Sequence, residues 1–190
     1  MQRHWQYLKY VIRHKWFVFQ ECLKLGVPLW IAILHDWDKF LPEMWFSYAA
    51  CFYKPDGSNQ YVETIAYSQA WNGHAKRNKH HWQYWVLLED EGKVIPLPMP
   101  DVFRREMLAD WRGAGRAITG KDNTLSWYID NFYKIKLHDD TRAWIDHELT
   151  GLAMPLDVIA QSNNVSVHHL KDQFLADAIR LGRCKQSTKN

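Results

Sequence analysis

The spacing of apolar residues along the chain predicts a series of helices. In residues 3–25 apolar positions recur every three or four residues and stop at Gly26, a residue type that commonly follows a helix C-terminus. The same reasoning predicts further helices over residues 42–53, 60–85, 102–112, 124–135, 140–149, 156–161 and 167–181. We therefore expect an all-α protein.

One of the apolar runs differs from the others because it has no polar face. Residues 29–36 follow Pro28, which suits the first turn of a helix, and they are almost wholly apolar up to His35. A helix that is hydrophobic all round belongs in a protein core. We expect this short helix to be buried, with His35 and Asp36 at its end.

Turn signals divide the chain. The polar residues 89–92 between two apolar runs predict at most a small β-hairpin, and the helix over 102–112 is expected to stop near Gly113 and Gly115. The apolar pattern breaks again over residues 151–155. We predict a helical domain over residues 1–150 and a C-terminal helical extension over residues 151–190.

Composition narrows the class of protein. A net charge of +3 is too small for a dedicated nucleic-acid binder, and three cysteines at long spacings fit neither a disulfide framework nor a zinc site. The longest apolar stretch, residues 16–34, is interrupted by polar residues, so we expect no membrane span. The N-terminus does not have the pattern of a signal peptide, which predicts a cytoplasmic protein.

Histidines and carboxylates are the strongest chemical signal. His35 and Asp36 are adjacent at the end of an apolar helix, and buried polar groups need partners. A divalent metal ion suits them, because imidazole and carboxylate are its usual ligands. His14 falls on the apolar face of the first helix, and Asp110 follows Glu106 by one helical turn, so these side chains can face the same interior.

A second group of histidines follows further along the chain. His74, Asn78 and His81 are spaced i, i+4, i+7, which aligns them on one face if the helix over residues 60–85 is continuous. His80 lies beside them, and we expect one of His80 and His81 to point outward. A second metal ion can be held at this face.

The order of these motifs resembles the HD superfamily of metal-dependent phosphohydrolases, including a lysine, Lys39, three residues after the aspartate. Over roughly residues 5–149 the chain also resembles DUF5662, a family of uncharacterised phage and bacterial proteins. Four runs carry this resemblance: residues 13–15, 35–40, 74–82 and 105–111. The resemblance implies an HD-domain-like helical bundle in which Asp36 bridges two metal sites. Carried over from the HD pattern, the first ion would be bound by His14, His35, Asp36 and Asp110, and the second by His74 and either His80 or His81.

The resemblance also implies hydrolysis of a nucleotide or another small anionic phosphoester. The cofactor is one or two divalent transition metal ions, Mn, Co, Ni, Fe or Zn, which activate water and neutralise phosphate charge. The expected catalytic residues are Asp36, Lys39 and Glu106, the last by orienting an imidazole or moving a proton. The expected phosphate-binding residues are Lys76, Arg77 and Arg105, together with Arg104.

Two other functions fit the same residues. An HD-type di-iron oxygenase would use the same ligands, because identical side chains bind several metals. A noncatalytic module would use the metal only to stabilise its core, and its tail would bind DNA or a partner. Residues 159–170 imitate the first half of a helix-turn-helix but do not have a basic recognition face. We expect the C-terminal helices to pack on the domain or to form a homo-oligomer rather than to bind nucleic acid. Lys39 is open to a further alternative, a surface ion pair with Asp38 or Glu43.

Overall fold

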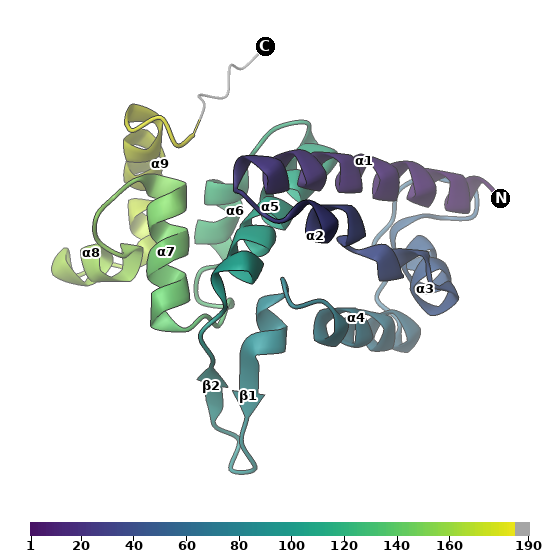
Figure 1. Cartoon of the computed structure of the whole chain (residues 1–190), viewed down its shortest axis with the longest axis horizontal. Coiled ribbons are helices and arrows are strands. Elements are labelled where there is room, and N and C mark those ends of the chain that lie inside the picture. Colours follow the sequence, from purple (N-terminus) through teal and green to yellow (C-terminus); the bar gives the residue numbers. More distant parts are fainter. Residues whose placement is uncertain (185–190) are drawn as a thin grey trace. The chain divides into compact units, whose positions relative to one another are not determined.

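Figure 1 shows the computed structural model of the chain, in which residues 1–184 are described. The described residues form nine α-helices, three short 3-10 helices and one two-stranded antiparallel hairpin, so the prediction of a mostly α-helical protein with a minor hairpin is confirmed. The contacts divide the chain into two compact units. The first contains residues 1–84 and 101–120, and the second contains residues 85–100 and the chain from Lys121 onward. A separate domain over residues 1–150 stays a prediction.

The regular elements of the first unit are helices. Its elements are α1 (Gln2–Lys24), α2 (Leu29–Leu34), the 3-10 helix η1 (Trp37–Phe40), α3 (Pro42–Phe52), α4 (Ile65–Arg77) and α5 (Asp101–Thr119). Helix α1 ends as its sequence predicts: Gly26 has a φ of +70°, and the Val27 N–H donates to the Cys22 carbonyl at 2.9 Å. This left-handed glycine closes the helix and turns the chain back toward α2.

Helix α5 is longer than its glycines suggested. It passes through Gly113 and continues to Thr119, so the expected stop near Gly113 is wrong. The reason is packing against α1, because a Cβ at Gly113 would lie 2.4 Å from Val18 Cγ2 and 2.7 Å from the Val18 backbone nitrogen. The missing side chain lets α1 and α5 approach closely, and both helices carry residues of the site described below.

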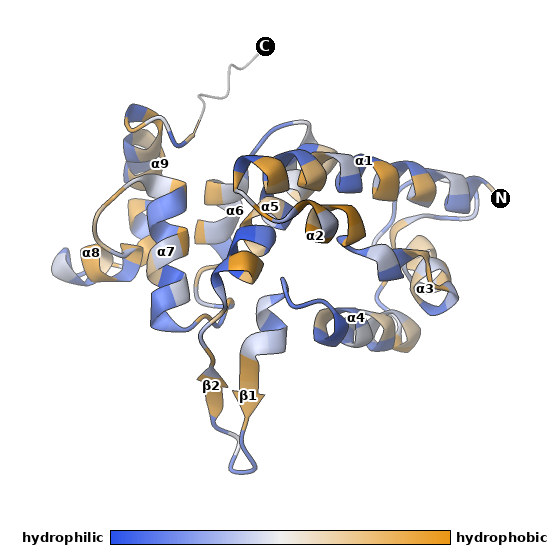
Figure 2. Cartoon of the chain, in the orientation of Figure 1, coloured by the Kyte–Doolittle hydropathy of each residue, from blue (hydrophilic) through white to orange (hydrophobic). Residues whose placement is uncertain are grey.

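Helix α2 is not buried as its composition suggested. Only Ile31 and Ala32 are buried, and they pack with Val18 and Cys22 of α1. Its other four side chains, Leu29, Trp30, Ile33 and Leu34, are more than half exposed. Figure 2 shows the apolar colouring of this short helix. A six-residue helix covered on one side cannot bury an apolar surface that runs all round it.

The helix expected over residues 60–85 is broken. Residues 60–64 are not helical, and α4 begins at Ile65 after Thr64, whose hydroxyl accepts the Tyr67 N–H at 3.1 Å. The helix ends at Arg77, and Asn78 has an extended conformation, with φ −104° and ψ 112°. A short 3-10 helix, η2 (Trp82–Trp85), follows after a turn. The chain beyond Asn78 therefore does not continue along the face of α4.

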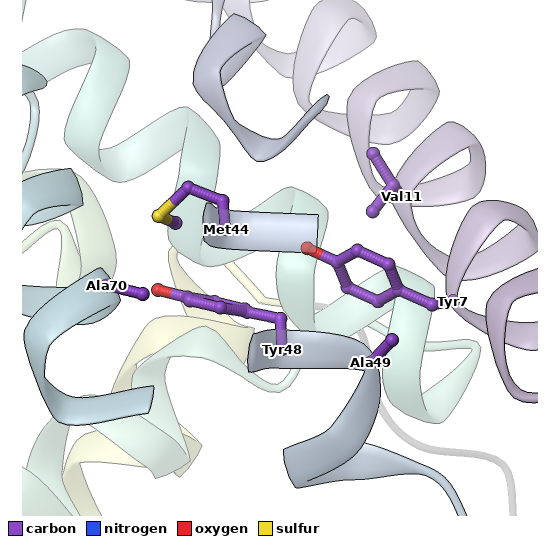
Figure 3. Close-up of a cluster of buried hydrophobic side chains, with 6 residues drawn as sticks. All are labelled: Tyr7, Val11, Met44, Tyr48, Ala49 and Ala70. Atoms are coloured by element: carbon purple, nitrogen blue, oxygen red, sulfur yellow. The ribbon is translucent and has the colours of Figure 1, made fainter. Parts of the chain in front are cut away.

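An apolar cluster joins α1, α3 and α4. Figure 3 shows its six buried side chains, which are Tyr7, Val11, Met44, Tyr48, Ala49 and Ala70. The rings of Tyr7 and Tyr48 lie 6.3 Å apart, and the Tyr48 ring also contacts the His74 ring edge to face at 6.4 Å. The core of the first unit thus supports a histidine of the site directly.

The second unit holds the hairpin and the C-terminal helices. Its elements are β1 (Val86–Leu88), β2 (Val94–Pro96), α6 (Thr124–Asn131), α7 (Asp139–Thr150), α8 (Leu156–Ser162), the 3-10 helix η3 (Val167–Leu170) and α9 (Lys171–Arg180). The buried Asp146 connects three helices, because it accepts the Tyr128 hydroxyl at 2.8 Å and the Leu156 N–H at 2.9 Å. Burial raises the pKa of Asp146 to about 6.

None of the helices in the described part of the chain combines the length and the apolar character that crossing a membrane requires.

Candidate metal centre

Four ligand-type side chains meet inside the first unit. Helix α1 supplies His14, α5 supplies Asp110, and the turn between α2 and η1 supplies His35 and Asp36. His14 Nε2 lies 3.1 Å from Asp36 Oδ2 and 3.3 Å from Asp110 Oδ1. His35 Nε2 lies 3.3 Å and 3.5 Å from the same two oxygens. The structure thus brings together the first predicted group of ligands.

The backbone of Asp36 explains how adjacent residues face one site. Asp36 has a φ of +53°, a left-handed conformation that is uncommon for residues other than glycine and is tolerated best by Asp and Asn. His35 before it is extended, with φ −45° and ψ 127°. On the other side of the turn, the Lys15 amine donates to the carbonyl oxygen of His35. This turn leaves the His35 and Asp36 side chains buried while α2 stays at the surface.

A second group forms around the other oxygen of Asp36. Asp36 Oδ1 lies 3.3 Å from His74 Nε2 and 3.3 Å from His80 Nε2. The ring of His81 completes the group, with centroids 4.6 Å from His74 and 4.2 Å from His80. Both His80 and His81 are buried, so the expectation that one of them points outward is wrong. The turn after Asn78, rather than a continuous helix, lets both rings face inward.

Unpaired polar atoms line the space between these side chains. The buried Nε2 atoms of His35, His74, His80 and His81 and the buried Oδ1 of Asp36 have no hydrogen-bond partner among the described residues. Such atoms are unusual in folded proteins, because each costs free energy unless something binds it. Imidazole nitrogen and carboxylate oxygen are donors for transition metal ions. The two groups could therefore each hold a metal ion, with Asp36 shared between them.

Glu106 supports the cluster from outside. The Nδ1 atoms of His35 and His80 lie 3.0 Å and 3.2 Å from Glu106 Oε1. A carboxylate can only accept, so both Nδ1 atoms donate and both Nε2 atoms remain available to a metal ion. Burial opposes ionisation of Glu106, but these hydrogen bonds outweigh it and lower the pKa of the carboxyl.

Asp38 orients His74 in the same way, by accepting from its Nδ1 atom. It accepts from His74 Nδ1 at 3.0 Å, from an Arg77 guanidinium nitrogen at 2.9 Å and from the Asn78 amide at 3.0 Å. The sequence analysis missed this role and considered Asp38 only as a partner of Lys39 at the surface. In the structure Asp38 is fully buried. The position of Asp38, two residues after Asp36, indicates this role only once the left-handed turn at Asp36 is known.

Lys39 binds the shared carboxylate rather than a surface acid. Its Nζ lies 2.6 Å from Asp36 Oδ2, and the residue is buried. Burial acts to lower the pKa of Lys39, but the Asp36 carboxylate outweighs it and raises the pKa, so the amine stays charged. Burial opposes a charge on His35, but Asp36 and the other carboxylates outweigh it and raise the pKa of His35, so in the absence of an ion Nε2 carries a proton that a bound metal would replace. Burial also opposes ionisation of Asp36, and the charges of His35 and Lys39 overcome it and hold the pKa of Asp36 far below its usual range.

His14 has the protonation state that a metal ligand requires. Burial, and then the charge of Lys39, lower the pKa of His14 to about 4. The imidazole is therefore neutral near pH 7, and only neutral imidazole binds a metal ion. Burial likewise lowers the pKa of His81, and electrostatic repulsion from His80 and His74 lowers it further.

Two of the cations predicted to bind phosphate, Arg77 and Arg105, have protein partners. Arg105 donates to the Asp101 carboxylate at 2.6 Å and to the Leu25 carbonyl at 2.9 Å, and Arg77 binds Asp38. Lys76 is exposed on α4. Their role in binding phosphate stays a prediction.

The fold and the site define a mostly helical protein with buried His, Asp and Glu groups that could hold metal ions. The chain belongs to the DUF5662 family, a family of unknown function whose model matches residues 3–150. The family resemblance found in the sequence is thereby confirmed, and the likeness to HD-domain proteins stays a prediction. No curated protein and no solved structure matches the chain.

Proposed function

We propose that this chain is a metal-dependent phosphohydrolase that acts on a nucleotide or another small phosphoester with two divalent ions. The observation that carries this proposal is the Asp36 carboxylate, which turns Oδ2 toward His14 and His35 and Oδ1 toward His74 and His80. A carboxylate shared between two sets of imidazoles suits a pair of divalent ions, and such pairs are common in phosphatases and nucleases. The order of these residues along the chain, which resembles that of HD-domain enzymes, supports the same reaction.

The first ion is assigned to His14, His35, Asp36 and Asp110, and the second to Asp36, His74, His80 and His81. When bound, such ions lower the pKa of water and neutralise phosphate oxygens. Lys39 holds Asp36 between the two groups, and Glu106 holds His35 and His80 with their Nε2 atoms inward. The Asp110 side chain is 13% exposed, compared with 2% or less for His14, His35 and Asp36. The phosphoester is therefore proposed to approach from the side of Asp110, with Lys76, Arg77 and Arg105 as phosphate-binding cations.

Metal analysis followed by a substrate panel tests the proposal. The purified protein is analysed for bound metal and then assayed on nucleotides and other phosphoesters with Mn²⁺, Co²⁺, Ni²⁺, Mg²⁺ or Fe²⁺ added singly. We expect metal-dependent turnover that falls by about 100-fold or more in Asp36→Ala and His35→Ala, because activated water requires the ion. His168→Ala, which removes an exposed imidazole of the second unit, should change neither metal content nor rate.

Each failure has a separate meaning. Full metal binding by Asp36→Ala would show that the ions are held elsewhere. Bound metal without turnover of any phosphoester would contradict the phosphohydrolase. If oxygen uptake with Fe²⁺ were measured instead, the protein would be an oxygenase that uses the same ligands.

A further inference from the structure

The segment over residues 26–40 exposes six large apolar side chains. Six large side chains, each between 47% and 64% exposed, form what we call the α2 face: Leu29, Trp30, Ile33, Leu34, Trp37 and Phe40. The first four share one side of α2, opposite the buried Ile31 and Ala32, and the last two lie in η1 directly after it. Large exposed apolar patches on proteins usually mark interaction sites.

The α2 face carries no exposed charge. The segment contains three charged residues, Asp36, Asp38 and Lys39, and all three are buried in the metal centre. The charges that would normally keep such a surface soluble therefore point inward. The centres of homodimer interfaces have this composition, with few charges and many aromatic and aliphatic residues.

Helix α1 extends the apolar surface. The Lys15 amine donates to the carbonyl oxygens of Ile33 and His35, so this part of α1 lies beside the end of α2. Ile12 and Trp16, one helical turn apart on α1, are both 57% exposed. Figure 2 shows the apolar colouring of α2 together with apolar positions along α1.

We propose that the α2 face binds the α2 face of a second copy of the chain and forms a symmetric dimer. Six side chains exposed by about half supply on the order of 600 Å² per chain, or roughly 1,200 Å² between two copies, which is the lower limit of stable specific interfaces. Ile12 and Trp16 would increase this area. An apolar surface is complementary to itself, so the two-fold arrangement that is commonest among oligomers satisfies it.

A lipid surface fits this face less well. Helices that lie in a membrane interface combine an apolar face with many Lys and Arg residues and are usually several turns long. Helix α2 has six residues, and the single cation of the segment, Lys39, is buried against Asp36. Lys15 of α1 lies beside α2, but its amine donates to the Ile33 and His35 carbonyls, so the α2 face itself has no cation to attract an anionic headgroup.

The oligomeric state of the full chain tests the proposal. Light scattering after size exclusion, and sedimentation over a range of concentrations, should give twice the mass of one chain. Ile33→Glu places a charge at the centre of the α2 face and should give a monomer, with an unchanged circular dichroism spectrum because this side chain is exposed. Ile65→Glu is the matched control: Ile65 is 80% exposed at the start of α4, away from the face, and its variant should remain a dimer.

Two results would overturn the proposal. The first is a wild-type chain that is monomeric at all concentrations, whether or not the monomer binds vesicles of anionic lipid. The second is an Ile33→Glu protein that stays dimeric. If Val158→Glu, which changes an exposed residue of α8, is then monomeric, the interface lies on the C-terminal helices. If Ile33→Glu fails to fold, Trp30→Ser, which removes the most exposed side chain of the face without adding charge, replaces it.

Discussion

Asp38 determines which nitrogen of His74 faces the metal centre. In Asp38→Asn, an NH2 group replaces one of the two oxygens that face His74 Nδ1, and the negative charge paired with Arg77 is lost. We expect the ion held by His74, His80 and His81 to bind about 10- to 100-fold more weakly, as is typical when the partner of a ligand imidazole is lost. Measuring metal content after dialysis against graded ion concentrations checks this.

The first group of ligands should keep its ion in the same variant, since Asp38 contacts none of its histidines in the described contacts. Asp130→Asn, which changes an exposed carboxylate paired with Lys171, is the control and should bind metal as the wild type does. An Asp38→Asn protein with unaltered binding of both ions would refute the orienting role.

Residue type and order were enough to predict which side chains meet at the candidate metal centre and that Glu106 supports an imidazole, but not the roles of Asp38 and Asn78. Imidazole and carboxylate on apolar helices already indicate a buried metal site, because buried polar groups need partners and a divalent ion binds both types. Asp38 and Asn78 have no such signature, since polar residues beside a helix end usually face solvent. Only the left-handed turn at Asp36 and the end of α4 at Arg77 direct these two side chains inward.

Asp146 in the second unit gives a pH dependence that is independent of metal. Its pKa is raised to about 6 in the folded chain, above the value of roughly 4 for an unfolded chain. The folded state therefore binds the proton more tightly, and this contribution to stability is complete below pH 4 and is lost as the pH rises through 6. Its size is at most about 3 kcal/mol. The free energy of unfolding is measured by urea denaturation for wild type and Asp146→Asn from pH 4 to pH 7. As the pH rises over this range, the wild type should lose stability relative to the variant by up to this amount.

At the scale of elements, the crossing of α1 and α5 is the feature most sensitive to a small change. Gly113→Ala would place a Cβ 2.4 Å from Val18 Cγ2, so the two helices must separate. We expect a loss of about 1–3 kcal/mol of stability, as for other overpacked cores. Metal affinity should also fall, because α1 carries His14 and α5 carries Asp110. Urea denaturation and metal titration measure the two effects.

Gly73→Ala is the matched change within α4. There the new Cβ meets only the Arg77 guanidinium at 3.6 Å, an ordinary contact. Removing a glycine from a helix interior then stabilises by about 0.5–1 kcal/mol. Equal effects of the two substitutions would show that the close approach at Gly113 is unimportant.

Gly113 and α2 show why some elements were not predictable. A glycine inside a helical pattern can indicate either the end of the helix or a place where another helix approaches closely. At Gly113 the distinction depends on Val18, which lies 95 positions away in the sequence. An apolar run predicts a buried helix, and the sequence does not show how many sides of that helix other elements cover. The ends of α1, in contrast, depend on local chemistry alone and were predicted closely.

At the scale of the whole molecule, metal should stabilise one unit and not the other. All seven candidate ligands lie in the first unit, within residues 1–84 and 101–120. An ion that binds only the folded state adds about 3 kcal/mol to the free energy of unfolding when its free concentration is 100 times its dissociation constant. We expect chelation to lower the thermal unfolding midpoint of the wild type and to leave the midpoint of Asp36→Ala unchanged.

Hydrogen exchange locates this effect. After chelation, exchange should become faster in α1, α2, α4 and α5, whereas α6 to α9 of the second unit should keep their protection. Uniform loss of protection over both units would mean that they unfold together and that metal acts on the whole chain.

The ligands come from four separate stretches of sequence, between His14 and Asp110, and they are drawn together where polar atoms otherwise go unpaired. An ion at this place is a cross-link that can be withdrawn. Proteases act on the fraction of molecules that is open, and a few kcal/mol changes that fraction many-fold. We therefore expect a cell deprived of the ion to contain less of this protein, rather than a store of inactive chains awaiting metal, so that metal supply sets its abundance as well as its activity.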